Sequence, residues 1–114
     1  MTQIVGLAFP VLAGNEGRAR NFAADVKSRK KDFEKSSKRL KIKRHAWFLQ
    51  QLPASSTIIV FFEADDIQKS MADFGQSADP FDVWLKDGTK AITGMDFNSP
   101  RQDPYPEVLF SDGF

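Results

Sequence analysis

The side chains best suited to chemistry in this chain are His45 and Trp47, which lie two positions apart. His45 is the only histidine of the 114 residues, and an imidazole titrates near neutral pH, which suits it to general acid or base catalysis. Residues two positions apart on a strand share one face. On the open side of a sheet, His45 would lie in a cavity beside Trp47, so it is the candidate catalytic residue. The alternative left open is a histidine that is hydrogen-bonded at a dimer interface or exposed at the end of a strand.

Several aromatic side chains suit contact with a flat ligand, and one acidic side chain has no clear local role. The candidate ligand-binding residues are Trp47, Phe61, Phe81, Trp84 and Asp96. Aromatic residues also fill the cores and interfaces of small domains, so a purely structural role is the competing interpretation. For Asp96 the competing interpretation is a turn in which its carboxylate accepts a hydrogen bond from the following backbone.

The composition excludes several kinds of site. The chain has no cysteine, which excludes disulfides, thiolate metal sites and a cysteine nucleophile. A single histidine excludes a multi-histidine metal site within one chain. Glycine-rich phosphate loops and the G-x-S-x-G and H-E-x-x-H motifs are absent from the sequence. We therefore expect neither a metal nor a cofactor.

Charge is distributed unevenly along the chain. Residues 1–62 hold 12 Lys and Arg against 4 Asp and Glu, whereas residues 63–114 hold 4 against 11. Ten of the 16 basic residues lie between Lys27 and Arg44. Clustered cations can neutralise nucleic-acid phosphates, so this basic segment suggests nucleic-acid binding. The interpretation we favour is a solvated helix surface.

The length predicts a single domain that spans residues 1–114. The longest apolar run, residues 58–62, is too short to cross a bilayer. No Lys or Arg precedes the apolar stretch at the N-terminus, as a signal peptide would require. We therefore expect a cytoplasmic protein with no membrane segment.

Hydrophobic periodicity predicts the elements that position these residues. Apolar strand patterns cover residues 3–11, 44–52, 57–63 and 107–111, and the last is expected at a sheet edge because prolines precede it. Apolar spacings of three and four predict a first helix from Asn15 to about Ser37. A second helix is expected to begin at a capping box formed by Asp65 and Gln68 and to end at Gly75.

A third helix is expected from Asp79 and Pro80, which suit a cap and a first helical position, to Gly94. The order β-α-β-β-α-α-β is that of a ferredoxin-like α+β sandwich with an extra helix, in which helices cover one face of a four-stranded antiparallel sheet. The other face is still apolar and aromatic, and soluble monomers rarely expose such a patch. Burying several hundred Å² at about 25 cal/mol per Å² contributes several kcal/mol before association costs. We therefore predict a homodimer in which two sheets pack face to face into a barrel-like core.

Three segments carry a family resemblance. They read Asp-Pro-Phe-Asp-Val-Trp-Leu-Lys from Asp79, Ile-Thr-Gly-Met-Asp-Phe from Ile92 and Pro-Glu-Val-Leu-Phe from Pro106, and the strands at His45 and Ile58 agree with them. On these segments the sequence resembles the dimeric α+β barrel superfamily, and the resemblance covers nearly the whole chain. Within it the chain is most similar to short bacterial proteins related to antibiotic-biosynthesis monooxygenases. The resemblance implies a homodimer, and its members include cofactor-free monooxygenases of aromatic polyketides, haem-degrading enzymes and proteins without known activity.

The haem-degrading branch implies an Asn on the first strand with a Trp and a His in the same pocket. Residues 3–11 contain no Asn, and His45 and Trp47 share one strand, which disfavours haem degradation. RNA binding through the sheet is disfavoured because residues 58–62 read Ile-Ile-Val-Phe-Phe, without the glycines of RNA-recognition strands.

We therefore expect a homodimer that binds a small hydrophobic or aromatic molecule in a cavity between sheet and helices. If the protein is an enzyme, the expected class is a cofactor-independent oxygenase or isomerase, with His45 as the proton carrier and Trp47 as a stacking wall. The first alternative is a non-catalytic regulatory or interaction module, which a cavity filled by Trp and Phe would favour. The second is nucleic-acid binding through the basic segment.

Overall fold

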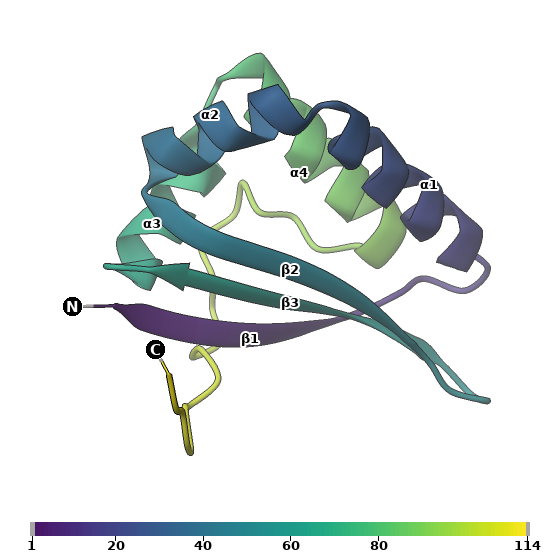
Figure 1. Cartoon of the computed structure of the whole chain (residues 1–114). Helices are drawn as coiled ribbons and strands as arrows, with labels where there is room; N and C mark the ends of the chain where they lie inside the picture. The colour runs from purple at the N-terminus through teal and green to yellow at the C-terminus, as the bar shows by residue number, and fades with distance from the viewer. Residues whose placement is uncertain (1, 114) are drawn as a thin grey trace.

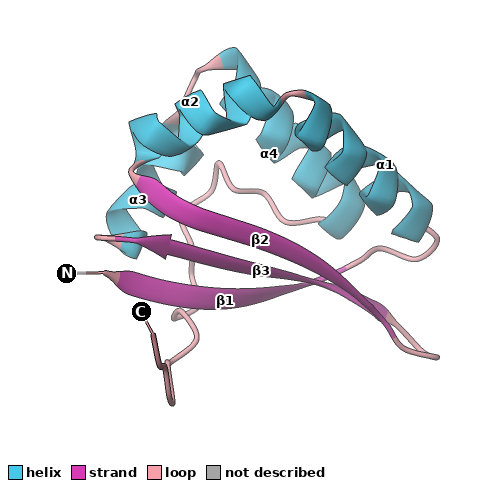
Figure 2. Ribbon diagram, in the orientation of Figure 1, coloured by secondary structure: helices cyan, strands magenta, loops and turns pink. Residues whose placement is uncertain are grey.

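Three strands and four helices make up an α+β fold, and the helices lie on one face of the sheet (Figure 1, Figure 2). The structure is a computed structural model that describes residues 2–113. The elements follow one another as β1 (Gln3–Pro10), α1 (Glu16–Ser28), α2 (Lys30–Leu40), β2 (Ile42–Gln51), β3 (Ser56–Ala64), α3 (Ile67–Gln76) and α4 (Pro80–Thr93). None of the helices in residues 2–113 is both long and apolar enough to cross a membrane.

The sheet is antiparallel, with the order β1-β3-β2, so β3 lies in the centre. This is the strand with the longest run of β-branched and aromatic residues, which suit a strand that is paired on both sides. In the register, Phe62 of β3 lies opposite Val5 of β1 and His45 of β2. Val5 and Phe62 are buried against the helices, with Phe62 only 1% exposed. The register therefore places His45 on the helix-covered face and not on the open face that the sequence suggested.

Two apolar clusters fill the space between the sheet and the helices. The first consists of Val5, Leu7, Phe9, Phe62, Ala64 and Ile67, and the second of Val26, Leu40, Phe74, Phe81 and Leu85. Three partly buried side chains, Ile42, Met71 and Phe97, pack against both clusters. The sheet and the helix layer are therefore joined by side chains from a strand, a helix and a loop.

The single long helix expected after Asn15 is in fact two helices that meet at Arg29. The backbone of Arg29 leaves helical geometry (φ −105°, ψ 36°), and its N–H donates to the carbonyls of Asp25 and Val26. A straight helix would separate Phe22 from Phe33 by about 16 Å along its axis. Because of the break, the rings of both lie within 6.4 Å of the ring of Trp47.

The residues that cap α4 are those expected from the sequence, whereas the N-terminal cap of α3 differs from the expectation. Asp79 accepts a hydrogen bond from the N–H of Phe81, Pro80 begins α4, and Gly94 ends it at a positive φ of 78°. The cap of α3 is Asp66, which accepts from the N–H of Lys69, and not Asp65. Asp65 instead forms an ion pair with a lysine at the start of β2.

Residues 94–113 contain neither a helix nor a strand, so the fourth strand expected over residues 107–111 is absent from this described part of the chain. The sheet has three strands within residues 2–113. Pro104 and Pro106 have no N–H to donate to a neighbouring strand, which weakens pairing at this point. The segment leaves Leu109 and Phe110 89% and 85% exposed. The last part of the described chain, drawn in yellow, lies below β1 in the view of Figure 1.

Candidate functional site

A cavity of about 100 Å³ lies between the sheet and the helices. Its walls come from all three strands, all four helices and the loop after α4, and they are mostly apolar. The aromatic wall residues are Phe9, Phe22, Phe33, Trp47, Phe62, Phe74 and Phe97. An engineered apolar cavity of about 150 Å³ in another protein binds benzene, so a one-ring ligand would fill this smaller cavity and extend into its opening.

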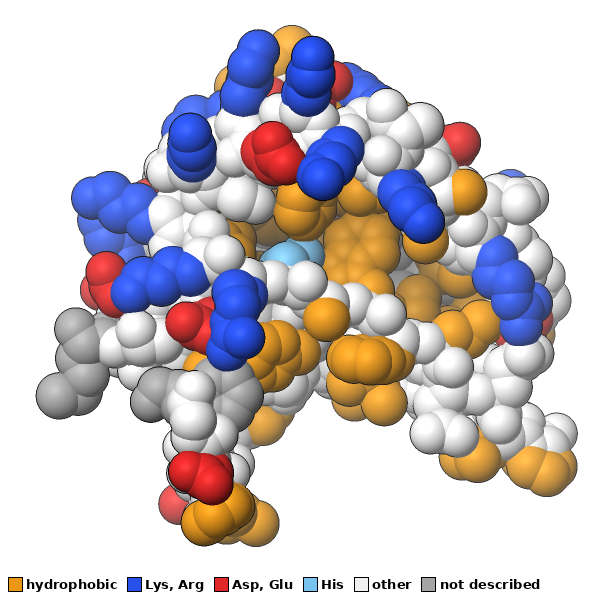
Figure 3. Space-filling view, in the orientation of Figure 1, with side chains coloured by type: hydrophobic (Ala, Val, Ile, Leu, Met, Phe, Trp, Pro, Cys, Tyr) orange, Lys and Arg blue, Asp and Glu red, His pale blue; other side chains and the backbone are white. Residues whose placement is uncertain are grey.

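The cavity is part of a hollow that opens on the side of β2. Figure 3 shows apolar side chains and the single histidine inside this hollow, beneath the Lys and Arg side chains that gather over α1 and α2. β2 is an edge strand, so no further strand of residues 2–113 covers this side. A small molecule therefore has a route from solvent to His45 that does not require unfolding.

His45 and Trp47 are joined directly by a hydrogen bond. The Nε1–H of Trp47 donates to Nδ1 of His45 over 3.0 Å. The imidazole also lies against two phenylalanine rings, with centroid distances of 5.2 Å to Phe33 and 5.9 Å to Phe62. Burial in these surroundings lowers the pKa of His45 to about 4. The imidazole is therefore neutral at pH 7, and it is a weak base there.

Trp47 forms an aromatic wall together with α1 and α2. Its ring is stacked with Phe22 at a centroid distance of 6.3 Å and an interplanar angle of 13°. Phe33 meets the same ring edge-on, at 6.4 Å and 76°. These two orientations are the favoured geometries of aromatic pairs. They hold the indole in the orientation that its hydrogen bond to His45 requires.

The remaining candidate residues do not share this cavity wall. Phe81 and Trp84 lie side by side on α4, with centroids 5.6 Å apart, and the guanidinium of Arg29 lies 4.9 Å and 4.5 Å from their ring centroids. Trp84 contacts the cavity-lining Phe22, whose centroid lies 5.0 Å from its own. Phe81 and Trp84 therefore support the aromatic wall from behind.

Phe61 and Asp96 lie elsewhere. Phe61 is paired with Gly6 and Ala46, so it lies on the open face of the sheet. Asp96 forms a turn, because its carboxylate accepts from the backbone N–H of Asn98 over 3.0 Å. This backbone hydrogen bond is the main cause that lowers the pKa of Asp96. The structure therefore brings together His45 and Trp47 and separates them from Phe61 and Asp96.

The sequence did not identify several side chains of the cavity as functional. Phe22 and Phe33 were recognised on the apolar side of a helix, but nothing in that pattern distinguishes a cavity wall from a filled core. Phe97 follows α4 in an irregular loop, where no periodicity applies. It reaches the cavity because Gly75 on α3 has no side chain, which lets the Phe97 carbonyl approach the helix backbone.

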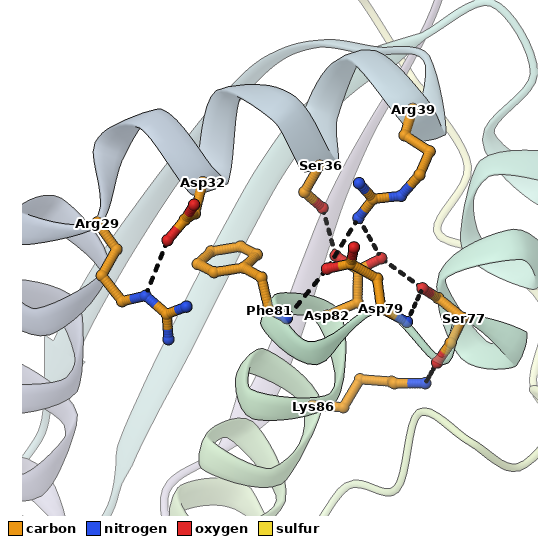
Figure 4. A network of polar contacts seen from close by, with 9 residues as sticks. All are labelled: Arg29, Asp32, Ser36, Arg39, Ser77, Asp79, Phe81, Asp82 and Lys86. Carbon is orange, nitrogen blue, oxygen red and sulfur yellow. Dashed lines mark hydrogen bonds and ion pairs between the residues drawn. The ribbon is translucent and has the colours of Figure 1, made fainter.

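A buried polar network lies next to the cavity (Figure 4). The carboxylate of Asp82 is 0% exposed and accepts hydrogen bonds from Ser36, from Ser77 over 2.6 Å and from Arg39 over 2.7 Å. Burial alone would raise the pKa of Asp82, but these three hydrogen bonds hold it below its usual range. Lys86 on the same helix donates to the backbone carbonyls of residues 75 and 77. The network joins α2 to α4 and to the end of α3, and its polar groups are already paired.

The basic segment is less free to bind phosphates than its composition suggests. Five of its ten cations form ion pairs with carboxylates: Arg29, Lys30, Arg39, Lys43 and Arg44. Arg39 is held by the buried Asp82. Ion pairing of this kind reduces the charge that a nucleic acid would meet.

Comparison with protein-family models, with curated proteins and with solved structures gives no match. Similarity therefore supplies neither a family nor a function for this chain, and the resemblance to the dimeric α+β barrels stays a prediction.

Proposed function

We propose that this protein binds a small, mostly apolar molecule of about one aromatic ring in the cavity between its sheet and its helices. The observation that carries the proposal is a cavity of about 100 Å³ with aromatic walls, reached from solvent beside β2 (Figure 3). A ligand in this space would bury its own apolar surface against the aromatic walls, which favours binding.

Binding is better supported than proton transfer. A cofactor-independent oxygenase or isomerase would need His45 to accept a proton from its substrate near neutral pH. With a pKa of about 4, His45 is a poor base under those conditions. Its Nδ1 is also occupied by the hydrogen bond from Trp47. The imidazole therefore suits recognition of a ligand more than catalysis.

We also propose that the protein is a homodimer that packs through the open face of the sheet. The apolar side chains on that face are Ile4, Ala8, Ala46, Phe48, Ile59 and Phe61. Phe48 is 56% exposed, and no helix covers this face (Figure 2). The exposed Leu109 and Phe110 would find apolar surface and a free strand edge in the partner. In that dimer, residues 107–111 would add the fourth strand of a ferredoxin-like sheet, and the two sheets would form an α+β barrel.

The binding proposal is tested with a one-ring hydrocarbon, α-methylstyrene, in a ¹H–¹⁵N NMR titration. The chain has two tryptophans, so the spectrum contains two indole N–H signals, which the variant Trp84→Phe assigns. We expect saturable shifts of the Trp47 indole signal, because this ring lines the cavity.

The control uses two residues of α2 next to each other. Ser37 lines the cavity, so Ser37→Phe fills it and is expected to abolish the shifts. Lys38 is exposed, so Lys38→Phe adds the same ring on the outside and is expected to leave them unchanged. Unchanged binding in Ser37→Phe would contradict the proposal. So would the absence of a saturable shift in the unmodified protein with both α-methylstyrene and its carbonyl analogue acetophenone.

A further inference from the structure

The hydrogen bond between Trp47 and His45 determines which nitrogen of the imidazole carries its proton. An indole N–H can only donate a hydrogen bond. Nδ1 of His45, which receives it over 3.0 Å, must therefore be unprotonated. A neutral imidazole has one N–H, so the proton lies on Nε2. Trp47 thus makes His45 a hydrogen-bond donor at Nε2.

The Nε2–H of His45 has no hydrogen-bond acceptor within residues 2–113. The only hydrogen bond that this ring forms there is the one at Nδ1. No fully buried side-chain nitrogen or oxygen in this part of the chain lacks a partner, so Nε2 is not sealed inside the core. His45 is a wall residue of the cavity, and Nε2 is therefore accessible from that space or from its opening.

Most other polar groups on the cavity wall are already used. The hydroxyl of Ser36 donates to Asp82, that of Thr89 to the carbonyl of Leu85, and that of Thr93 to the carbonyl of Thr89. Ser37 on α2 is the one further wall hydroxyl among the described residues. The cavity has little polar surface. A neutral donor that lacks an acceptor therefore makes a large difference between the affinities of ligands that can accept its hydrogen bond and those that cannot.

From this we infer that the cavity selects planar aromatic molecules that carry a carbonyl group beside the ring, and that the Nε2–H of His45 donates to the carbonyl oxygen. The inference rests on the proposed function, because it names the ligand class of the same cavity. The aromatic ring of the ligand would contact the rings of Trp47 and Phe33, whose planes are at 76° to each other. A carboxylate or an ammonium group is disfavoured because burying a charge among apolar walls is costly. A group that can only donate, such as an indole-type N–H, would meet another donor at Nε2.

The test compares two probes of nearly the same size. Acetophenone and α-methylstyrene differ only in a carbonyl oxygen against a methylene group on the atom next to the ring. Both are titrated into the protein while the Trp47 indole signal and the imidazole ¹⁵N signals are followed. His45 is the only histidine, so its ring signals need no assignment. We expect acetophenone to bind about fivefold to tenfold more tightly, as one hydrogen bond in an apolar site allows.

The free protein is expected to show the ¹⁵N pattern of an Nε2–H tautomer, and only acetophenone is expected to shift the Nε2 signal. In His45→Phe, which keeps a ring of similar size without a donor, the two probes are expected to bind equally. Equal binding of both probes in the unmodified protein, with an unchanged Nε2 signal, would overturn the inference but leave the binding proposal intact. Failure of both probes to bind would overturn the binding proposal as well. An Nδ1–H tautomer in the free protein would overturn the inference without any variant.

Discussion

Arg39 and Asp82 lie 43 residues apart in the sequence and are joined by a 2.7 Å ion pair between α2 and α4. Asp82 is fully buried, whereas the side chain of Arg39 is 42% exposed. The carboxylate thus receives three hydrogen bonds in the interior, one of them from a cation at the surface. This pair fixes α2 against α4, and with it the position of Ser36 and Ser37 at the cavity.

The first prediction concerns this pair. Asp82→Asn keeps the shape of the side chain but removes its charge and turns one acceptor into a donor that faces the donors of Ser36, Ser77 and Arg39. We expect the free energy of unfolding to fall by about 2–3 kcal/mol, as measured by urea denaturation. Asp87→Asn on the exposed side of the same helix is the control, with an expected change within about 0.5 kcal/mol. Equal effects of the two variants would show that the network contributes little.

The second prediction is a pH dependence that arises from His45. Its pKa is about 4 in the folded protein and near 6.5 in an unfolded chain, so the unfolded state binds the proton first as the pH falls. Stability is therefore complete above pH 6.5 and decreases as the pH falls from 6.5 towards 4. Between pH 7 and pH 5 the loss attributable to His45 is about 2 kcal/mol.

Urea denaturation of the protein and of His45→Phe at both pH values measures this loss. Phenylalanine does not titrate, so the variant is expected to lose about 2 kcal/mol less between pH 7 and pH 5. The same dependence in both proteins would mean that the folded imidazole titrates normally, in conflict with its buried position.

The third prediction uses two helical glycines as a matched pair. A methyl group at Gly88 on α4 would clash with the ring of Phe22, which is stacked on Trp47. Gly88→Ala is expected to displace Phe22 and to destabilise the protein by about 1–3 kcal/mol. Gly17 on α1 has open space around it, so Gly17→Ala is expected to stabilise the protein by up to about 1 kcal/mol. Thermal unfolding measures both changes in stability, and tryptophan fluorescence in a Trp84→Phe background reports the environment of Trp47. An unchanged Trp47 environment in Gly88→Ala would mean that Phe22 does not hold this ring.

The fourth prediction addresses the proposed dimer. Phe48 is an exposed aromatic on the open face of the sheet, and Phe48→Lys would place a charge in the proposed interface. We expect sedimentation equilibrium at micromolar concentration to give a dimer for the unmodified protein and a monomer for this variant. Val83→Lys, an exposed apolar position on α4, is the control and is expected to stay dimeric. A monomeric unmodified protein would contradict the dimer.

The secondary structure was predictable wherever one residue type dictates the local geometry. The central strand β3 and the limits of α4 at Asp79, Pro80 and Gly94 were predicted and are confirmed by the structure. The break at Arg29 was not predictable, because no glycine or proline marks it and it arises from packing of Phe22 and Phe33 on β2. The fourth strand over residues 107–111 was predicted from the local sequence pattern. A strand also needs a neighbour to pair with, and residues 107–111 pair with neither β1 nor β2, although both are edge strands within residues 2–113.

The sequence was sufficient to predict that His45 and Trp47 lie side by side. It was not sufficient to predict which side chains surround them. Alternation along β2 places His45 and Trp47 on one face, as expected. Which face the helices cover depends on the register with β3, which local sequence does not determine. The direct hydrogen bond between these two side chains was also not predictable, because it depends on rotamers that Phe22 and Phe33 constrain.

The cavity has walls from every strand and every helix, which has a consequence for the dynamics of the whole domain. A molecule bound there contacts both the sheet and the helices. Its binding therefore stabilises these elements together and not one element alone. Amide hydrogen exchange in the loaded protein should therefore slow together in β1, β3 and α4, as one cooperative unit, and not only in the strand that carries His45.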